Sequence, residues 1–236
     1  MATIQILSDL HLEAPKAYDV FHIPPVAPYL ALLGDIGNVK HPEFFAFLRA
    51  QLSRFKIVFL LLGNHEPYGS PWATTKAKIH NFEKTTGPDK DAKGTAGRFE
   101  RVSFGLNDFY DIQGWSTELH NQEYAADLAW LNTQAASLSE KEPNRKILIF
   151  THHSPTLLSA ASNPKNSGSP IASGFASDLS KEFCWTSGQV KVWAFGHTHY
   201  NCDFVEEKSG KRVIANQRGY CFSQSEGFEE KKVIEV

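Results

Sequence analysis

The most constraining feature of this sequence occurs five times: an apolar run stops abruptly at Asp, Asn or His. The clearest case is the wholly apolar run Ile57–Leu62, which leads directly into Gly63–Glu66 (Gly-Asn-His-Glu). An uninterrupted apolar run of this length predicts a strand that is buried on both faces of a sheet. Polar groups just past the carboxyl end of such a strand lie where open α/β sheets form their ligand crevices.

Four other runs, at residues 4–7, 29–33, 147–150 and 190–195, are apolar except for Gln5 and Lys191 and end in the same way. The polar residues that follow them are, in order, Asp9 and His11, Asp35, His152, and His197 and His199. One Asp-x-His or Gly-Asp pair alone is weak, because such short motifs occur by chance. Their repetition at the same topological position predicts that five strand ends converge on a metal site. Gly34, Gly63 and Gly196 fit this prediction, since glycine allows a sharp turn or a close approach of the backbone.

Composition places the chain among soluble globular proteins, with 42% hydrophobic and 21% charged residues in 236. Because the motifs run from near the start to residue 199, we expect a single domain over residues 1–236. The net charge of -2 and the pI near 6.5 argue against a dedicated nucleic-acid surface or an anionic-membrane surface.

The compartment is predicted from the start of the chain and from its cysteines. Met1-Ala2-Thr3 leads straight into the first apolar run, which leaves no room for a secretion signal. No apolar run approaches the ~20 residues of a membrane-spanning helix. The three cysteines, at 184, 202 and 221, have no paired short spacing and predict free thiols in a reducing cytoplasm.

The remaining elements follow from periodicity and from breaker residues. Helices are expected over residues 42–55, from 70 or 71 to 85, over 121–139, and from 177 or 178 to 185. Short strands are expected at 99–103 and 109–112, a hairpin at 203–207 and 211–215, and a closing strand at 232–236. Residues 86–97 form a polar loop. The Pro-, Ser- and Asn-rich segment 154–177 is either a loop that flanks the substrate or an exposed connector.

In this order, the strand-end motifs resemble the signature of the calcineurin-like metallophosphoesterases, over residues 9 to 199. The resemblance implies an α/β fold that is a four-layer α/β/β/α sandwich of two mixed sheets with helices outside. It also implies two metal ions. Asp9, His11 and His199 would bind the first, Asn64, His152 and His197 the second, and Asp35 would bridge both. His65 would face the substrate without binding metal.

The donor types agree with this division. Imidazole and carboxylate ligands suit divalent transition metals, with manganese as our first choice and iron, zinc or cobalt as alternatives. One bridging carboxylate is enough to hold two cations ~3.5–4 Å apart, the separation that clamps an in-line displacement at phosphorus. Metal-activated hydroxide would attack phosphorus, with Asp35 bridging the ions and His65 assisting the leaving group. Glu66 either orients the metal-binding imidazoles from behind by hydrogen bonds or is a solvated turn residue.

Three further residues are candidates for substrate contact. Tyr68 and His153 lie next to predicted ligands, although packing or exposure at the rim would explain them equally well. Arg218, in Asn216–Tyr220, offers a guanidinium that can bind a phosphate with two hydrogen bonds. A structural turn is the alternative for this segment.

The sequence favours a binuclear phosphoesterase acting on small or nucleotide-like phosphodiesters. A phosphomonoesterase or protein phosphatase on the same site remains open, although a protein phosphatase is expected to carry a longer domain and an arginine pair. A non-enzymatic scaffold is disfavoured because all seven ligands and His65 are present. A nuclease is disfavoured because no basic tract leads to the metals. The expected partner is a small phosphoester, with no nucleic-acid polymer and no membrane, and the oligomeric state is left open.

Overall fold

Two mixed sheets form the centre of the molecule in the computed structural model, which describes residues 2–86, 108–166, 168–169 and 171–235. In this part of the chain the first sheet has the strand order β10-β1-β2-β3 and the second has the order β4-β5-β7-β6. The first comprises β1 (Thr3–Leu7), β2 (Tyr29–Leu33), β3 (Ile57–Leu61) and β10 (Val233–Glu235). The second comprises β4 (Ile147–Phe150), β5 (Val190–Phe195), β6 (Cys202–Val205) and β7 (Arg212–Ala215).

The direction of the strands brings the motifs together. β1, β2 and β3 are parallel, and so are β4, β5 and β7, whereas β10 and β6 run antiparallel to their neighbours. Parallel strands present their carboxyl ends at one edge of the sheet. The register keeps these ends level, since Leu7 pairs with Leu32 and Leu33 pairs with Leu61. All five predicted apolar runs are therefore strands, and their polar ends lie at common edges.

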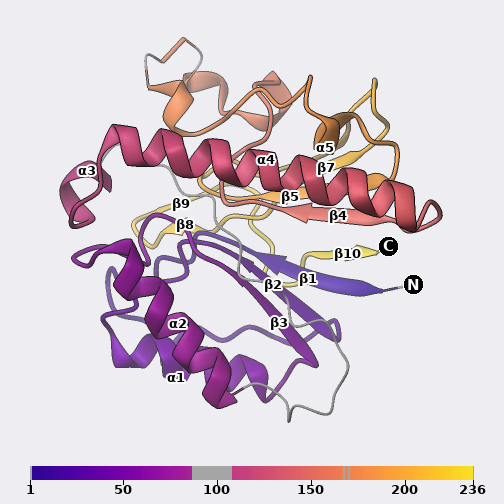
Figure 1. Ribbon diagram of the computed structural model, residues 1–236. Helices are drawn as coiled ribbons and strands as arrows, with labels where there is room; N and C mark the ends of the chain where they lie inside the picture. Colours follow the sequence, from indigo (N-terminus) through magenta and orange to yellow (C-terminus); the bar gives the residue numbers. More distant parts are fainter. Residues whose placement is uncertain (1, 87–107, 167, 170, 236) are drawn as a thin grey trace.

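Helices cover the outer faces of the sheets, which gives four layers (Figure 1). α1 (Pro42–Leu52) and α2 (Trp72–Thr86) lie beside the first sheet, and α4 (Thr117–Lys141) and α5 (Phe183–Thr186) lie beside the second. Side chains on β2 alternate between two cores: Leu30 and Leu32 pack under the helices, while Ala31 and Leu33 pack between the sheets. The predicted four-layer α/β/β/α sandwich is confirmed.

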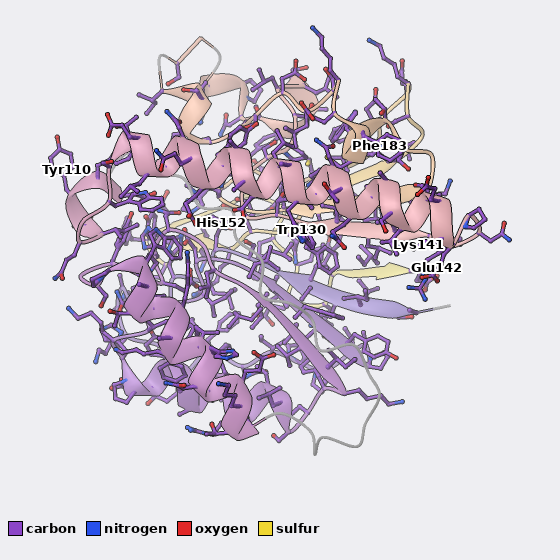
Figure 2. All side chains as sticks on the ribbon, in the orientation of Figure 1. Tyr110, Trp130, Lys141, Glu142, His152 and Phe183 are labelled. Carbon is purple, nitrogen blue, oxygen red and sulfur yellow. The ribbon has the colours of Figure 1, made fainter. Side chains whose placement is uncertain are left out.

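The predicted strand at residues 109–112 is wrong, because these residues belong to the helical turn α3 (Asp108–Asp111) and the residue after it. The backbone N–H of Ile112 donates to the Asp108 carbonyl at 2.9 Å. Tyr110 points into solvent with 91% of its surface exposed (Figure 2), so it does not fill a strand position in a core. A short apolar run without alternation does not distinguish helix from strand.

Three predicted helices have different ends in the structure. α4 begins at Thr117 rather than at residue 121, because the Ser116 side chain accepts the backbone N–H of Leu119 and caps the helix earlier. The helix predicted from 177 or 178 is only α5, since Asp178 Oδ1 accepts the Ser180 N–H and holds a turn there. α1 ends at Leu52 rather than at residue 55.

The carboxyl-terminal predictions are confirmed. β6 and β7 pair as the expected antiparallel hairpin, and β10 closes the first sheet. A small hairpin that was not predicted follows, formed by β8 (Gly219–Tyr220) and β9 (Ser223–Gln224). The segment 154–177 contains short 3-10 turns at Ser159–Ala161, Pro164–Asn166 and Ala172–Gly174. The predicted loop residues 87–97 and the predicted strand at 99–103 lie outside the described residues.

Within the described ranges, no helix combines the length and the apolar character needed to cross a membrane. Cys184, Cys202 and Cys221 are free, as predicted.

Candidate metal centre

The predicted ligands form two neighbouring groups at the strand ends. We call Asp9, His11 and His199 the open set, and Asp35, Asn64, His152 and His197 the deep set. In the open set, one ligand atom from each side chain lies within 4.8 Å of the others. The same holds for Asp35, His152 and His197 in the deep set.

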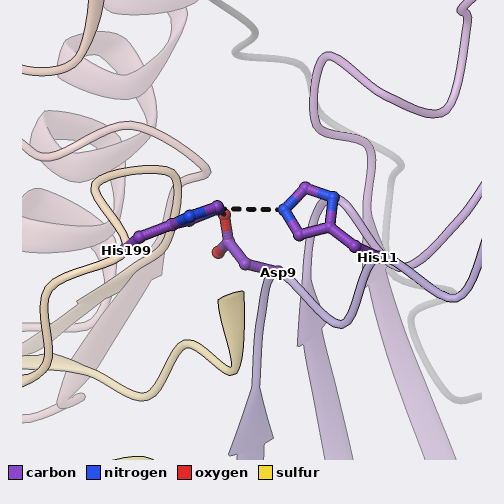
Figure 3. Close-up of side chains that lie close together, drawn as sticks. All are labelled: Asp9, His11 and His199. Carbon is purple, nitrogen blue, oxygen red and sulfur yellow. Dashed lines mark hydrogen bonds and ion pairs between the residues drawn. The ribbon is translucent and has the colours of Figure 1, made fainter. Parts of the chain in front are cut away.

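The open set converges on one small volume (Figure 3). His11 Nε2 lies 2.9 Å from His199 Nε2, and His199 Nε2 lies 3.3 Å from Asp9 Oδ1. Asp9 and His11 are buried, whereas 27% of the His199 side chain is exposed. Burial raises the pKa of Asp9, but the hydrogen bond and charge of His199 and the charge of His152 outweigh it and lower the pKa to about 2. This group therefore presents one carboxylate and two imidazoles towards a common point.

The deep set is enclosed at the centre of the molecule, where Figure 2 shows His152. His152 Nε2 lies 3.1 Å from Asn64 Oδ1 and 3.4 Å from Asp35 Oδ2. The other ring nitrogen, Nδ1, lies 2.8 Å from the Leu33 carbonyl, which fixes it as the N–H and turns the Nε2 lone pair inward. His197 Nε2 lies 3.1 Å from the Gly174 carbonyl, so its Nδ1 is the nitrogen that remains to bind a cation.

Negative charge gathers around the deep set. Burial lowers the pKa of His152, but the Asp35 and Asp9 carboxylates outweigh burial and raise it to about 10. Burial also lowers the pKa of His197, to about 3, and the charge of His152 acts in the same direction. The carboxylates thus attract positive charge to this point, which a divalent cation would supply in place of a proton on His152.

Backbone strain marks the same residues. Among the described non-glycine residues, those with positive φ are Asp9, His11, Asp35, His197 and His199, with φ between 46° and 70°. Such conformations are costly for ordinary side chains and persist at functional sites, where the surroundings enforce them. All five belong to the two ligand sets.

Glycine is required at two of the predicted positions, because side chains of candidate ligands lie too close to the backbone for a Cβ. A Cβ on Gly63 would lie 2.6 Å from His152 Nε2, and it would also collide with the Asp35 carboxylate. A Cβ on Gly196 would lie 2.6 Å from Asp9 Oδ2. Any side chain at either position would displace a candidate ligand.

Glu66 is fully buried and holds the backbone of this region. Its carboxylate accepts the N–H groups of Ile36 and Gly63 at 2.7 Å each, and that of Asp35 at 3.1 Å. Burial first, and then the Asp35 charge, raise the pKa of Glu66 to about 8. The solvated-turn interpretation is therefore wrong, and the hydrogen bonds reach backbone amides rather than the imidazoles that we expected.

His65 lies beside the open set and is held by a residue that sequence reasoning missed. Its Nδ1 lies 2.8 Å from Glu13 Oε1, and its Nε2 lies 3.2 Å from the Tyr220 hydroxyl. Glu13 Oε1 also lies 3.4 Å from His11 Nδ1. Burial lowers the pKa of His65, but the Asp35 charge and the Glu13 hydrogen bond outweigh it and raise the pKa to about 9.

Tyr68 contacts both the ligand region and His65. Its ring stacks on His65 with centroids 4.4 Å apart. Its hydroxyl accepts a hydrogen bond from Asn64 Nδ2 at 3.0 Å and donates to Asp108 Oδ1 at 2.9 Å. This arrangement turns Asn64 so that Oδ1 faces His152.

The other two candidate substrate residues are engaged within the protein. His153 is buried, and the centroid of its ring lies 4.3 Å from that of His197. These observations favour a packing role for His153 over exposure at the rim. Arg218 Nη1 donates to the Leu10 carbonyl at 3.0 Å, and its guanidinium lies over Phe21. These contacts favour the structural alternative for Arg218. The segment 154–177 does reach the site, since Phe175 stacks on His197 with centroids 4.9 Å apart.

Comparison with known proteins places this geometry in context. A family model described as calcineurin-like phosphoesterase matches residues 2–201. An uncharacterized protein of Acanthamoeba polyphaga mimivirus is 24% identical, with 93% of this chain and 92% of the viral protein covered. The crystal structure of the phosphopantetheinyl hydrolase from Mycobacterium tuberculosis is similar in fold, with a TM-score of 0.61 at 15% identity over 93% of this chain and 90% of that one. A dimetal phosphatase from Danio rerio gives a TM-score of 0.49 at 14% identity, covering 92% and 87%.

Proposed function

Because this chain belongs to the calcineurin-like phosphoesterase family, whose members are metal-dependent phosphoric ester hydrolases, we propose that its two ligand sets hold two divalent cations. The open set binds one cation, Asn64, His152 and His197 bind the other, and Asp35 bridges them. The single observation that carries this proposal is the coincidence of the two convergent sets with the strained backbone of five of their members.

The donors present fit such cations. Carboxylate, amide and imidazole donors suit manganese first, with iron, zinc or cobalt as alternatives. His152 is further oriented by a backbone carbonyl on its second nitrogen, the usual support of a metal-binding imidazole. When bound, the two cations supply an activated water nucleophile and neutralise charge that develops on the phosphate oxygens.

His65 is the proposed general acid. The Glu13 carboxylate holds Nδ1, which leaves Nε2 directed towards the Tyr220 hydroxyl, beside the open set. A protonated His65 in this position donates through Nε2 to the departing oxygen, and Glu13 balances the charge of the imidazolium. General acids of this kind contribute ~10²–10⁴-fold to the rate.

The proposed substrates are small or nucleotide-like phosphodiesters. The ligand shell contributes only the two charges of Asp9 and Asp35, so two divalent cations leave a positive excess that attracts an anionic phosphoester. Arg218 is engaged by the Leu10 carbonyl and the Phe21 ring, which disfavours a protein phosphatase that would use this arginine to bind phosphate. We also propose a cytoplasmic location, supported by the free cysteines.

A paired assay tests the function. Purified protein with Mn²⁺ is given bis-para-nitrophenyl phosphate and para-nitrophenyl phosphate, which share a leaving group. We expect higher kcat/KM for the diester. A preference for the monoester would transfer the assignment to phosphomonoesters, and two bound metals with neither ester cleaved would support the non-enzymatic scaffold.

Asp35→Ala tests the bridging role in the same preparation. We expect the loss of at least one metal per chain by elemental analysis, together with loss of turnover. His80→Ala is the matched control, because His80 lies on α2 with 60% of its side chain exposed. Full metal retention in Asp35→Ala would refute the bridge.

A further inference from the structure

Two aromatic rings extend from the candidate general acid to the protein surface. The Tyr220 hydroxyl lies 3.2 Å from His65 Nε2, and the Tyr220 ring stacks on His11 with centroids 4.1 Å apart. The next ring is that of Phe222, which lies 5.3 Å from Tyr220 at an interplanar angle of only 4°. The Phe222 side chain is exposed, at 78% of its surface.

A single exposed phenylalanine is ordinary on a protein surface. Phe222 differs because it occupies the tip of the β8–β9 hairpin, a turn position where polar residues are usual, and because its ring is parallel to one that touches the site. The base of the hairpin is fixed, since the backbone N–H of Arg218 donates to the Ser8 carbonyl at 3.0 Å. The two rings are therefore held in a defined position beside the open set.

We propose that Tyr220 and Phe222 form a stacking shelf for a planar ring on the leaving group of the substrate. This inference rests on the proposed function, because His65 marks the leaving-group side of the site. A ring attached to the departing alcohol passes Tyr220 and stacks on the outer face of Phe222. The substrate class is accordingly a phosphoester with a nucleoside or similar flat leaving group, rather than a purely aliphatic one.

Offset stacking explains why the pair suits such a ligand. Aromatic rings prefer parallel displaced or edge-to-face contacts, and Tyr220 and Phe222 already adopt the parallel form. A stacked base contributes ~1–3 kcal/mol of binding, which corresponds to roughly 5–150-fold in affinity. Stacking tolerates any base, so the shelf selects a flat ring without selecting its identity.

The test uses two substrates that are identical at the reacting phosphate. One is a nucleoside cyclic phosphate, and the other is the corresponding ribose cyclic phosphate without a base. We expect the native protein to have a KM about tenfold lower for the nucleoside substrate. Phe222→Leu keeps an apolar side chain but removes the ring. The ratio of the KM for the base-free substrate to the KM for the nucleoside substrate should therefore fall towards one. Phe222→Trp should preserve or increase the ratio.

Phe183→Leu is the matched control, because Phe183 is another exposed phenylalanine (44%) and lies on α5. It should keep the native ratio. Equal KM values for both substrates in the native protein, or an unchanged ratio in Phe222→Leu, would overturn the shelf.

Calorimetric titration keeps the two proposals separable if neither cyclic phosphate is cleaved. AMP and ribose phosphate are titrated into the Mn²⁺-loaded protein, a measurement that needs no turnover. Tighter binding of AMP that is lost in Phe222→Leu would retain the shelf while the proposed reaction fails. Equal binding of the two ligands would refute the shelf itself.

Discussion

The two ligand sets are supported in different ways. In the deep set, His152 and His197 are buried and are oriented by backbone carbonyls of Leu33 and Gly174. In the open set, His11 is oriented by a side chain, Glu13, and His199 is partly exposed. The fold itself thus fixes the deep set, whereas the open set depends on a few side chains that also surround His65. We infer that the deep set anchors a metal, and that the side chains around the open set, which contact His65, control the turnover rate.

The largest expected effect comes from two single variants, each of which removes one imidazole from one of the two sets. His152→Ala and His199→Ala should each lower kcat by about 10³-fold or more, since each removes a ligand of a charge-stabilising cation. Added imidazole should restore part of the activity of His199→Ala, because His199 is reached by solvent. It should not restore His152→Ala, because His152 is fully buried and its place is not reached from solvent.

His80→Ala measured with the same imidazole concentrations corrects for removal of metal by imidazole in solution. Equal rescue of both variants would eliminate the distinction between an open and a deep set.

The next effect in size concerns His65. His65→Asn should lower kcat by ~10²–10⁴-fold with a poorly departing alcohol, and much less with para-nitrophenolate, which leaves without help. Both metals should remain bound, because His65 is not a proposed ligand. Elemental analysis and rates for both leaving groups provide the measurement. An equal loss for both leaving groups would remove His65 from proton donation.

Glu13→Gln should have a smaller effect, about 10–100-fold on kcat, as expected for a residue that orients a functional imidazole. The amide keeps the size of the side chain but loses the charge that faces His65 Nδ1. We expect KM and metal content to change little, and the loss to grow as the leaving group becomes poorer. A uniform loss accompanied by loss of one metal would instead make Glu13 a support of His11 alone.

The deep set and the fold could be predicted largely from the sequence. The apolar run at residues 29–33 is a buried strand as expected, whereas the run at 57–62 forms the edge strand β3, where Ile57 is 46% exposed, so the prediction of burial on both faces is wrong there. Parallel pairing brings the residues after both runs to a common edge. Glu13 continues the alternate spacing of Asp9 and His11, and this spacing is the sequence signal that points to it. Assignment of the seven side chains to individual metals stays a prediction.

The surroundings of the open set could not be predicted, because they depend on loops. Glu13 lies 52 residues from His65 in sequence, and Tyr220 lies 155 residues away. Neither lies directly at the end of a predicted strand, and no periodicity describes the hairpin that carries Tyr220. The helical turn α3 was missed for a similar reason: its residue Asp108 is buried by contact with Tyr68, a tertiary interaction that local propensity does not report.

The smallest expected effect separates the two roles of Tyr220. Tyr220→Phe keeps the ring that stacks on His11 and Phe222 but removes the hydroxyl 3.2 Å from His65 Nε2. A net contribution of about 0.5–1.5 kcal/mol for one hydrogen bond corresponds to a change of roughly 2–13-fold in kcat. The ratio of the KM for the base-free substrate to the KM for the nucleoside substrate should stay at its native value, because the shelf is intact.

Tyr110→Phe is the matched control, since the Tyr110 side chain is 91% exposed on α3. It removes a hydroxyl without touching either set and should leave both constants unchanged. If Tyr220→Phe altered the KM ratio but not kcat, the hydroxyl would contact the substrate rather than His65. Control of proton donation by His65 would then rest on Glu13 rather than on the Tyr220 hydroxyl.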